Sequence, residues 1–280
     1  MNAGTANIAL SQLKELWLNT GTACNLSCPF CHEGSSPGDS RLPALGYELA
    51  CQTIDAAMDL GVERFAFTGG EPLILRDIQR ILLYALARRP CLVLTNGTAP
   101  MIRRTQHLAQ LRSATHPLSF RVSIDYADEA AHDAGRGLRN FRKALQGLKL
   151  LFDAGFEVGI TRRLQADEDS AATDARFRQI FTRNQLPRDL PIVALPELGP
   201  LRAAAIPAHA SVPAPRAPMC TTSRTAQVLG DGIAFTPCPM VDDDPQFLIE
   251  GPLARACQQP VRPVHPRCEL CRTIGISYQG

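Results

Sequence analysis

Three cysteines near the start of the chain are spaced closely enough to bind one inorganic centre. Cys24, Cys28 and Cys31 are separated by three and then two residues, and His32 follows directly. Thiolates in so short a loop can surround one corner of an iron–sulfur cubane, because cysteine is the usual ligand of such clusters. Zinc is an alternative, since three cysteines and one histidine also complete a tetrahedral zinc site. A buried set of unrelated thiols is the third possibility that the spacing leaves open.

A second group of cysteines lies toward the end of the chain. Its members are Cys220, Cys238, Cys268 and Cys271, with seventeen, twenty-nine and two residues between successive ones. Four thiolates are enough to ligate every iron of a cubane, and a C-x-x-C pair is also typical of a structural zinc site. We therefore predict a second metal centre here. Cys257 falls inside the same stretch and could replace one ligand, but we interpret it as a free buried thiol.

The composition of the 280 residues favours metal or redox chemistry for the ten cysteines. The N-terminal residues show no signal-peptide pattern, and no apolar run approaches the roughly 18–20 residues that cross a membrane. We therefore predict a cytoplasmic protein, in which disulfides are rare. With 29 basic against 27 acidic residues, the chain has no basic excess that would predict binding to nucleic acid or to a membrane. Cys51 and Cys91 fall within a predicted helix and a predicted strand, where we interpret them as packing residues.

The elements that must position these side chains alternate between strand and helix. Apolar periodicity predicts strands over residues 13–18, 62–67, 91–94, 119–124, 157–161 and 191–195, and helices over residues 47–60, 78–89, 101–111, 141–154 and 175–184. Short connections between such elements require parallel strands and right-handed crossovers. The pattern predicts an α/β fold, a partial (β/α)6 TIM-like barrel, with its chemistry at the carboxyl ends of the strands.

A change in composition after the last of these strands predicts a domain boundary. Six prolines interrupt the pattern between Pro196 and Pro218. Beyond them the chain has little helix signal, and Gly230-Asp231-Gly232 predicts a hairpin turn. We therefore expect a partial barrel over residues 1–196 and a small cysteine-rich domain over residues 197–280.

The first cysteine loop, with the aromatic Phe30 before its last cysteine, resembles the signature of the radical S-adenosylmethionine (SAM) superfamily. The resemblance implies that Cys24, Cys28 and Cys31 bind three irons of a 4Fe–4S cluster. The fourth iron would then receive the amine and carboxylate of SAM, and Phe30 would lie against the adenine. The resemblance also implies reductive cleavage of SAM to a 5′-deoxyadenosyl radical, which removes a hydrogen atom from the substrate.

Two further segments follow predicted strands and are similar to motifs of this family. Gly69-Gly70-Glu71-Pro72 resembles the GGEP segment, whose backbone and glutamate receive the methionine amino group. Thr95-Asn96-Gly97 resembles the TNG segment of the third strand. Glycines permit close approach of the backbone to a ligand, and a carboxylate suits an ammonium group. A plain turn at the end of a strand is the alternative for each segment.

A fourth match begins at Ser123-Ile124-Asp125, extends through His132 to Arg136, and is similar to the family's fourth-strand pattern. The resemblance implies that the serine and a following arginine contact the ribose and carboxylate of SAM. Arg136 is our candidate for that arginine, and a solvated surface arginine is the alternative. Arg162 and Arg163, just beyond the fifth predicted strand, are further candidates for binding the SAM carboxylate or an anionic group of the substrate.

The tail resembles the Twitch domain, a shorter relative of the SPASM extension that carries one auxiliary 4Fe–4S cluster. This resemblance implies an oxidative modification, a dehydrogenation or bond formation, of a small-molecule or peptide substrate, with the auxiliary cluster accepting an electron. It also implies an electron donor such as flavodoxin or ferredoxin. Residues 60–73 are similar to GTP 3′,8-cyclase as well, a family with three cysteines in its tail, so a redox-neutral cyclisation is the alternative. A non-catalytic cluster- or zinc-binding scaffold is the alternative of another class.

Overall fold

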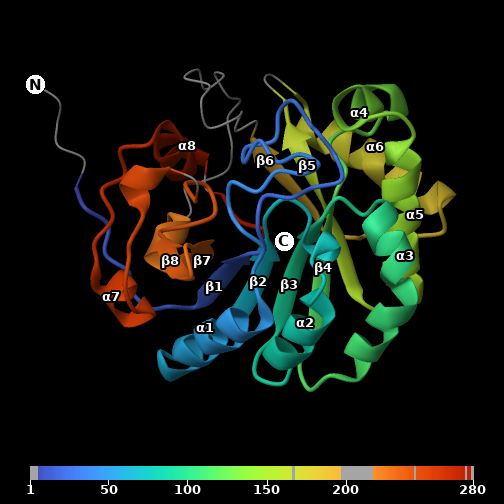
Figure 1. The fold of residues 1–280 in the computed structure, drawn as a ribbon. Coiled ribbons are helices and arrows are strands. Elements are labelled where there is room, and N and C mark those ends of the chain that lie inside the picture. The colour runs from blue at the N-terminus through green and yellow to red at the C-terminus, as the bar shows by residue number, and fades with distance from the viewer. Residues whose placement is uncertain (1–5, 166–167, 197–216, 243, 275, 279–280) are drawn as a thin grey trace, which may run out of the picture.

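One sheet of eight strands runs through the part of the chain that the computed structural model describes, residues 6–165, 168–196, 217–242, 244–274 and 276–278. The strand order is β6-β5-β4-β3-β2-β1-β7-β8, and all neighbours are parallel except β7 and β8. The sheet confirms the predicted α/β fold and partial barrel (Figure 1). The strands are β1 (Glu15–Asn19), β2 (Arg64–Thr68), β3 (Cys91–Thr95), β4 (Leu118–Ser123), β5 (Glu157–Leu164), β6 (Ile192–Pro196), β7 (Ser223–Leu229) and β8 (Gly232–Thr236).

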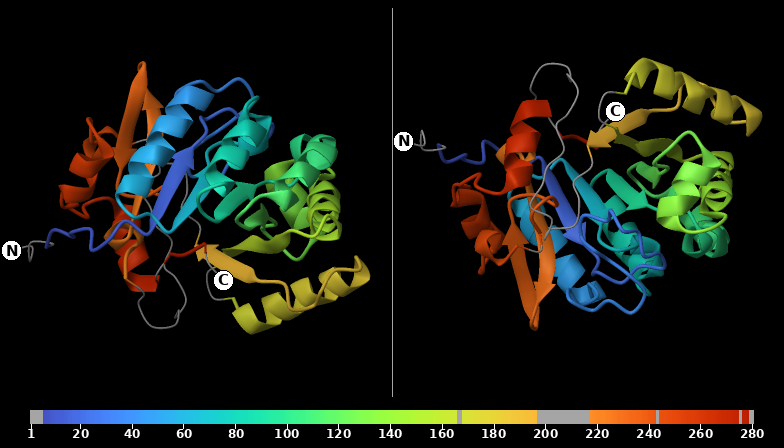
Figure 2. Two further views of the ribbon diagram at one scale, coloured as in Figure 1. Left: turned by 90° about the horizontal axis from the view of Figure 1, so that it is seen from below. Right: turned by 90° about the horizontal axis from the view of Figure 1, so that it is seen from above.

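Helices cover the outer face of the sheet, as Figures 1 and 2 show. They are α1 (Tyr47–Asp59), α2 (Ile78–Leu86), α3 (Ala99–Leu108), α4 (Glu129–Arg136), α5 (Asn140–Asp153) and α6 (Ser170–Arg183). Every helix predicted for the barrel is present, although α6 begins before the predicted residue 175. Asp169 explains the earlier start, because its carboxylate caps the helix by accepting the Ala172 amide at 3.0 Å.

The sequence does not predict α4, because this helix lacks an apolar stripe. Among its residues only His132 is buried. The helix begins after Asp128, whose side chain accepts the Ala131 amide at 2.8 Å, and it ends at Gly137, where φ is 92°. Capping at both ends therefore defines a helix that hydrophobic periodicity misses.

The two faces of β1 belong to different cores. Leu16 and Leu18 are fully buried in the large apolar core between the sheet and its helices. Trp17 points to the opposite face, where it joins Ala66 and Leu92 in a second buried cluster. This second cluster also contains Cys220, Cys238 and Cys271, with Cys268 packed against it. The inner face of the barrel and the cysteine-rich tail thus share one apolar interior.

The tail continues the sheet of the barrel. β7 pairs in parallel with β1, and the predicted hairpin turn at Gly230-Asp231-Gly232 joins β7 to β8. Contrary to the expectation of little helix, the tail contains α7 (Leu253–Gln258) and α8 (Pro266–Ile274). Contacts with the rest of the chain stabilise such short helices more than their own periodicity does. Arg224 illustrates this, because its buried guanidinium joins β7 to the carbonyl oxygens of Ala256 and Gln259 at the end of α7.

The predicted boundary after residue 196 falls at the end of β6, and residues 197–216 lie outside the described residues. The N-terminal segment runs along the tail, where Ile8 forms an antiparallel bridge with Val261. Asn19 at the end of β1 donates from Nδ2 to Asp242 Oδ2 at 2.8 Å. These contacts bring the first and last parts of the chain together beside β1.

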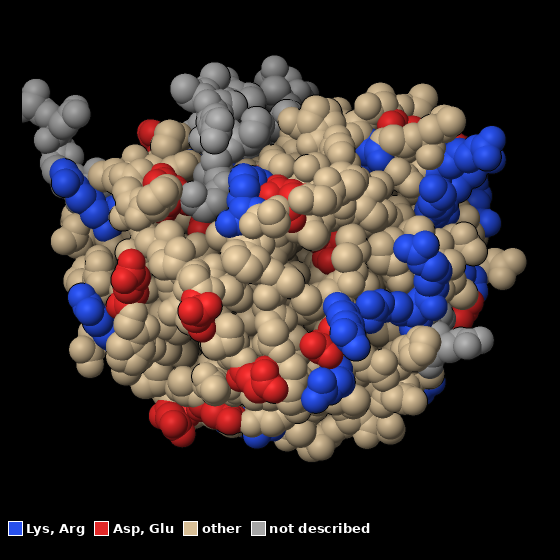
Figure 3. Space-filling view, in the orientation of Figure 1, with Lys and Arg blue, Asp and Glu red and all other residues tan. Residues whose placement is uncertain are grey.

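Charged side chains are unevenly distributed over the face shown in Figure 3. Lysine and arginine gather along the side formed by α3 and α5, whereas acidic side chains are more frequent around α1. The near-neutral total of +2 is therefore an average over two unlike sides. None of the helices in the described ranges has the length and apolar character needed to span a bilayer.

Candidate active site

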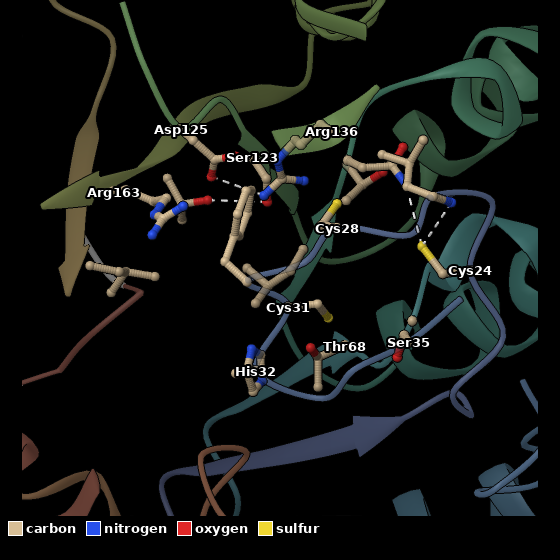
Figure 4. A pocket seen from close by; sticks show the side chains of 18 of the residues that line it. Cys24, Cys28, Cys31, His32, Ser35, Thr68, Ser123, Asp125, Arg136 and Arg163 are labelled. Carbon is tan, nitrogen blue, oxygen red and sulfur yellow. Dashed lines mark hydrogen bonds and ion pairs between the residues drawn. The ribbon is translucent and has the colours of Figure 1, made fainter. Parts of the chain in front are cut away.

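A cavity lies at the carboxyl ends of the parallel strands, where barrels of this kind place their chemistry. In Figure 4 the three N-terminal cysteines lie around the same hollow as Ser123, Asp125, Arg136 and Arg163. Its lining includes most residues of the predicted site: Cys24, Cys28, Phe30, Cys31, Gly69, Gly70, Thr95, Asn96, Ser123, Asp125, Arg136 and Arg162. Among the described residues that we predicted to bind SAM, only Glu71 and Pro72 do not line it.

Tight turns shape the loop that carries the three cysteines. The Cys31 amide donates to the Cys28 carbonyl at 3.0 Å, and the Gly34 amide donates to the Cys31 carbonyl at 3.0 Å. The Leu26 amide donates to Cys24 Sγ at 3.4 Å, a contact that favours the thiolate. Burial has the larger effect, however, and raises the pKa of the Cys24 thiol to about 12. A metal centre would have to displace this proton on binding.

The three thiols fit an iron–sulfur cluster by their donor chemistry and their common cavity. Within the described ranges, no three His, Cys, Asp or Glu side chains stand close enough together to hold a single metal ion. The ligands of a four-iron cubane lie farther apart than those of zinc, whose bonds to sulfur are about 2.3 Å. The three thiols line one cavity, and their number and chemistry fit three corners of a cubane.

Gly69 and Gly70 pack directly against the backbone of the cysteine loop. A Cβ atom on Gly70 would lie 2.2 Å from the Ala23 carbonyl oxygen, and one on Gly69 would lie 2.6 Å from the Gly21 carbonyl oxygen. The Gly70 amide donates to the Gly21 carbonyl at 2.8 Å, and the Glu71 amide donates to the Ala23 carbonyl at 3.0 Å. The glycines therefore do more than line the cavity, because they allow the loop after β2 to hold the cysteine loop in place.

The carboxylate of Glu71 accepts hydrogen bonds from other parts of the protein. Oε1 accepts the Leu73 amide at 3.1 Å and the Thr95 hydroxyl at 2.8 Å, and Oε2 accepts the Asn96 amide at 2.8 Å. Burial raises the pKa of this carboxyl group, which is 2% exposed. The side chain thus ties the loop after β2 to the end of β3. Pro72 lies in the short 3₁₀ turn that follows Glu71.

Asn96 connects the end of β3 to the cysteine loop. Its Nδ2 donates to Asn25 Oδ1 at 2.9 Å and lies 3.9 Å from Cys24 Sγ. Its Oδ1 accepts the Thr98 amide and hydroxyl, and Asn25 in turn donates to the Thr98 hydroxyl at 3.0 Å. This closed network positions Cys24, and Gly97 permits the chain to turn with a φ of 68°.

Phe30 lines the cavity and packs between two arginines and a glycine. Arg163 stacks over its ring at 4.1 Å from the centroid, and Arg136 lies at 5.8 Å. Gly135 makes room for the ring, because a Cβ there would lie 2.2 Å from Phe30. The guanidinium of Arg136 also forms an ion pair with Asp125, through Nε–Oδ2 and through Nη2–Oδ1 at 3.0 Å. Arg136 is therefore inside the site and not a solvated surface residue.

The two candidate arginines after β5 have different surroundings. Arg162 is 2% exposed, and its guanidinium pairs with Glu168 at 2.5 Å and with Asp174 at 2.7 Å. Two carboxylates therefore compensate its charge, although part of the side chain lines the cavity. Arg163 places its guanidinium against Phe30 and Tyr126. Both arginines line the cavity, and of the two it is Arg163 that contacts Phe30.

His32 faces the same cavity from the end of the cysteine loop (Figure 4). Burial, with a contribution from Arg267, lowers the pKa of its imidazole to about 3, so the ring is neutral. Its carbonyl oxygen accepts Arg267 Nη2 from α8 at 3.1 Å. A neutral imidazole can ligate a metal, so His32 belongs to the alternative of a zinc site with the three cysteines.

Several lining residues have no motif in the sequence. Thr68 ends β2, Thr161 lies within β5 at the end of the segment predicted as a strand, and Leu195 and Pro196 end β6. Their positions at carboxyl ends of strands were the only signal that could have identified them. Tyr278 reaches the cavity from the end of the described chain and packs against Trp17, with ring centroids 5.1 Å apart and ring planes inclined by 58°.

A second, smaller cavity is lined by all four cysteines of the tail: Cys220, Cys238, Cys268 and Cys271. Burial raises the pKa of the Cys220 and Cys268 thiols to about 11. Cys257 is not among the described residues that line this cavity; it packs against the outer core as a free but partly exposed thiol, and not as the buried thiol that we predicted. Cys91 is buried in the outer core as predicted, whereas Cys51 is partly exposed on α1.

The chain has relatives among characterised proteins. It is 32% identical over 151 residues to the AdoMet-dependent heme synthase of Nitratidesulfovibrio vulgaris, covering 52% of this chain and 39% of that protein. It is 31% identical over 191 residues to the GTP 3′,8-cyclase of Cronobacter sakazakii, covering 66% of this chain and 55% of that enzyme. The chain therefore spans between about two fifths and about half of the length of these relatives.

The chain is also similar to solved structures and to the sequence model of one protein family. The crystal structure of Streptococcus suis SuiB bound to S-adenosylmethionine superposes with a TM-score of 0.66 over 90% of this chain and 67% of that chain, at 15% identity. The sequence model of the radical SAM superfamily matches residues 18–164, more than half of the chain. The protein therefore belongs to the radical SAM superfamily, whose members use SAM and a 4Fe–4S cluster.

Proposed function

We propose that Cys24, Cys28 and Cys31 hold the 4Fe–4S cluster of a radical SAM enzyme that removes a hydrogen atom from its substrate. The single observation that carries this proposal is the common cavity, in which the three thiols meet residues of the other family motifs at the carboxyl ends of the strands. When bound, the cluster and SAM supply a 5′-deoxyadenosyl radical. The protein contributes binding, orientation and exclusion of side reactions.

We assign specific work to the side chains around the proposed cluster. Asn96 and Asn25 hold the Cys24 end of the cysteine loop, and the Gly69-Gly70 segment packs against the backbone of that loop. Phe30 provides an aromatic face for the adenine, with Gly135 behind it. Ser123, Arg136 and Arg163 offer a hydroxyl and two cationic groups for the ribose and carboxylate of SAM.

We further propose that residues 197–280 form a Twitch- or SPASM-like region with a second 4Fe–4S cluster on Cys220, Cys238, Cys268 and Cys271. The convergence of these four thiols on one cavity supports this. A cluster with all irons ligated by protein suits an electron acceptor, so we favour an oxidative reaction, a dehydrogenation or bond formation. A flavodoxin or ferredoxin is the proposed electron donor.

The substrate is proposed only as a class, a small molecule or a peptide. Relatives of the chain include a heme synthase and a GTP cyclase, and SuiB was also crystallised with the precursor peptide SuiA. The identity of 31% to GTP 3′,8-cyclase supports a redox-neutral cyclisation as the second candidate. Four cysteines in the tail favour the oxidative candidate, since the cyclase family has three.

Anaerobic reconstitution tests both clusters. Wild-type protein should bind about eight irons per chain and form 5′-deoxyadenosine from SAM under a chemical reductant. Replacing Cys24, Cys28 and Cys31 together by alanine should abolish 5′-deoxyadenosine and leave about four irons in the tail. Cys51→Ala is the matched control and should behave like wild type. SAM cleavage in the triple variant would refute the first proposal, and about four irons with one zinc in wild type would refute the second.

A second experiment separates oxidation from cyclisation once a substrate is found. Replacing Cys268 and Cys271 by serine should stop product formation, while SAM cleavage without product continues at the first cluster. Cys257→Ser should retain product formation, because Cys257 lies outside the four-cysteine cavity. The double variant must remain folded and still cleave SAM, since loss of a metal site can unfold a small region. Wild-type product formation by the double variant would make the second centre structural.

A further inference from the structure

One buried side chain contacts the backbone beside a cysteine of each group. Arg267 in α8 is 2% exposed. Its Nη1 donates to the Met240 carbonyl at 2.9 Å, and its Nη2 donates to the His32 carbonyl at 3.1 Å. Met240 follows Cys238 by two residues, and His32 follows Cys31 directly. The guanidinium therefore spans the distance between the two cysteine loops.

The position of Arg267 relates it to both cavities. Arg267 itself lines the cavity of the four tail cysteines. It binds the carbonyl of His32, and His32 lines the larger cavity at the carboxyl ends of the strands. The Arg267 amide donates to His265 Nδ1 at 3.1 Å, which fixes the start of α8. Its neighbour Cys268 is one of the proposed ligands, so a movement of this part of α8 moves a ligand and the guanidinium together.

We propose that Arg267 is a positioning residue that couples the two centres, so that occupation of the tail site holds the SAM-binding loop in its working conformation. The proposal rests on the proposed function, because it assumes a metal centre at each cysteine group. With the tail centre bound, Cys268 and Cys238 are fixed, and the guanidinium then clamps the His32 carbonyl. Without that centre, α8 and the Arg267 guanidinium are held less firmly, and the loop after Cys31 becomes more mobile.

The chemistry of the guanidinium supports a clamp and not a simple buried charge. Its planar fork directs separate N–H groups at two acceptors at once, which lysine cannot do in the same geometry. Buried hydrogen bonds from a charged donor are stronger than those between neutral groups. A second buried contact between the same parts of the chain, from Asn19 Nδ2 to Asp242 Oδ2, does not involve Arg267 and keeps them adjacent. Loss of the clamp should therefore loosen the loop without separating the tail from the barrel.

A thermodynamic cycle on SAM binding tests the coupling without any substrate. The variants are Arg267→Met, the Cys268→Ser/Cys271→Ser double variant and their combination, and calorimetry measures SAM affinity for each reconstituted full-length protein. We expect Arg267→Met and the cysteine double variant each to weaken SAM binding about tenfold, or about 1.4 kcal/mol. We expect the combination to be no weaker than either, because both remove the same clamp.

Additive losses in the combined variant would overturn the proposal, and so would an unchanged SAM affinity in Arg267→Met. Arg255→Met is the matched control, because Arg255 is exposed on α7, and it should bind SAM like wild type. If Arg267→Met does not fold, Arg267→Lys replaces it in the same cycle with a smaller expected loss and the same non-additivity. Failure of the proposed function is distinguishable, since wild-type protein would then bind no SAM or only about four irons.

Discussion

Glu71 lies one residue beyond two glycines of the cavity, and three hydrogen bonds from the protein use its carboxylate. The family resemblance implies that this glutamate receives the SAM amino group, and the structure adds a role in joining two strand ends. Its partners Thr95 and Asn96 line the cavity themselves. Glu71 can therefore influence SAM through its neighbours as well as directly.

We predict that Glu71→Ala lowers the free energy of unfolding by about 1–3 kcal/mol, because it leaves buried donors without an acceptor. SAM binding should weaken at the same time, since Asn96 loses the bond that holds its amide. Denaturant unfolding and calorimetry measure the two effects. Glu48→Ala, on the exposed side of α1, is the control and should change neither. If Glu71→Ala were as stable as wild type, the hydrogen bonds that Glu71 accepts would not stabilise the fold.

At the scale of elements, the contact between the loop after β2 and the cysteine loop leaves no room for a side chain. We predict that Gly70→Ala displaces the cysteine loop, because the new Cβ would lie 2.2 Å from a backbone oxygen. Iron content of the first site and SAM affinity should both fall. Gly46→Ala is a matched control, because a Cβ there would meet nothing within 4 Å. Normal iron binding by Gly70→Ala would show that the loops do not depend on this contact.

The junction of β4 and α4 should give the protein a defined acid sensitivity. His132 Nδ1 accepts the Asp125 amide at 3.2 Å, and Asp125 pairs with Arg136. Burial, and then the charge of Arg136, lowers the pKa of His132 from 6.5 to about 4. Between these values the unfolded chain binds a proton that the folded chain does not. The stability that neutral His132 contributes to the folded state is therefore fully present above pH 6.5, and it decreases as the pH falls toward 4.

We predict that the free energy of unfolding decreases by about 3 kcal/mol over this pH range because of His132 alone. Denaturant unfolding of the metal-free protein at pH 7, 5.5 and 4.5 measures the slope. His132→Gln should reduce the slope, whereas His107→Gln, at an exposed position on α3, should leave it unchanged. An equal slope in His132→Gln and wild type would assign the acid sensitivity to other groups.

On the scale of the whole molecule, the barrel and the tail are joined by a shared sheet. All five residues of β1 are buried between β2 and β7, and Trp17 packs on Tyr278. We predict that a chain ending at residue 196 aggregates, because β1 would become an exposed apolar edge strand. Size-exclusion chromatography beside the full chain tests this. A soluble monomer with cooperative unfolding would instead support residues 1–196 as an independent domain.

The sequence by itself determined the features that depend on residues close along the chain. Periodicity within short segments predicted the strands and most helices of the barrel, and the spacing of Cys24, Cys28 and Cys31 led to the superfamily. The GGEP and TNG segments were recognisable because each motif is continuous. Helix α4 was missed because capping residues, and not a stripe of apolar residues, define it.

Tertiary structure alone decided the features that depend on distant pairs. Arg267 meets a carbonyl 235 positions away, and Asn19 meets Asp242 across 223 positions. Arg162 and Arg163 are adjacent and chemically identical, yet Arg162 pairs with two carboxylates whereas Arg163 stacks on Phe30. The parallel pairing of β1 with β7 brings such partners together. No local pattern encodes that pairing, because strand partners are selected by the burial of whole faces.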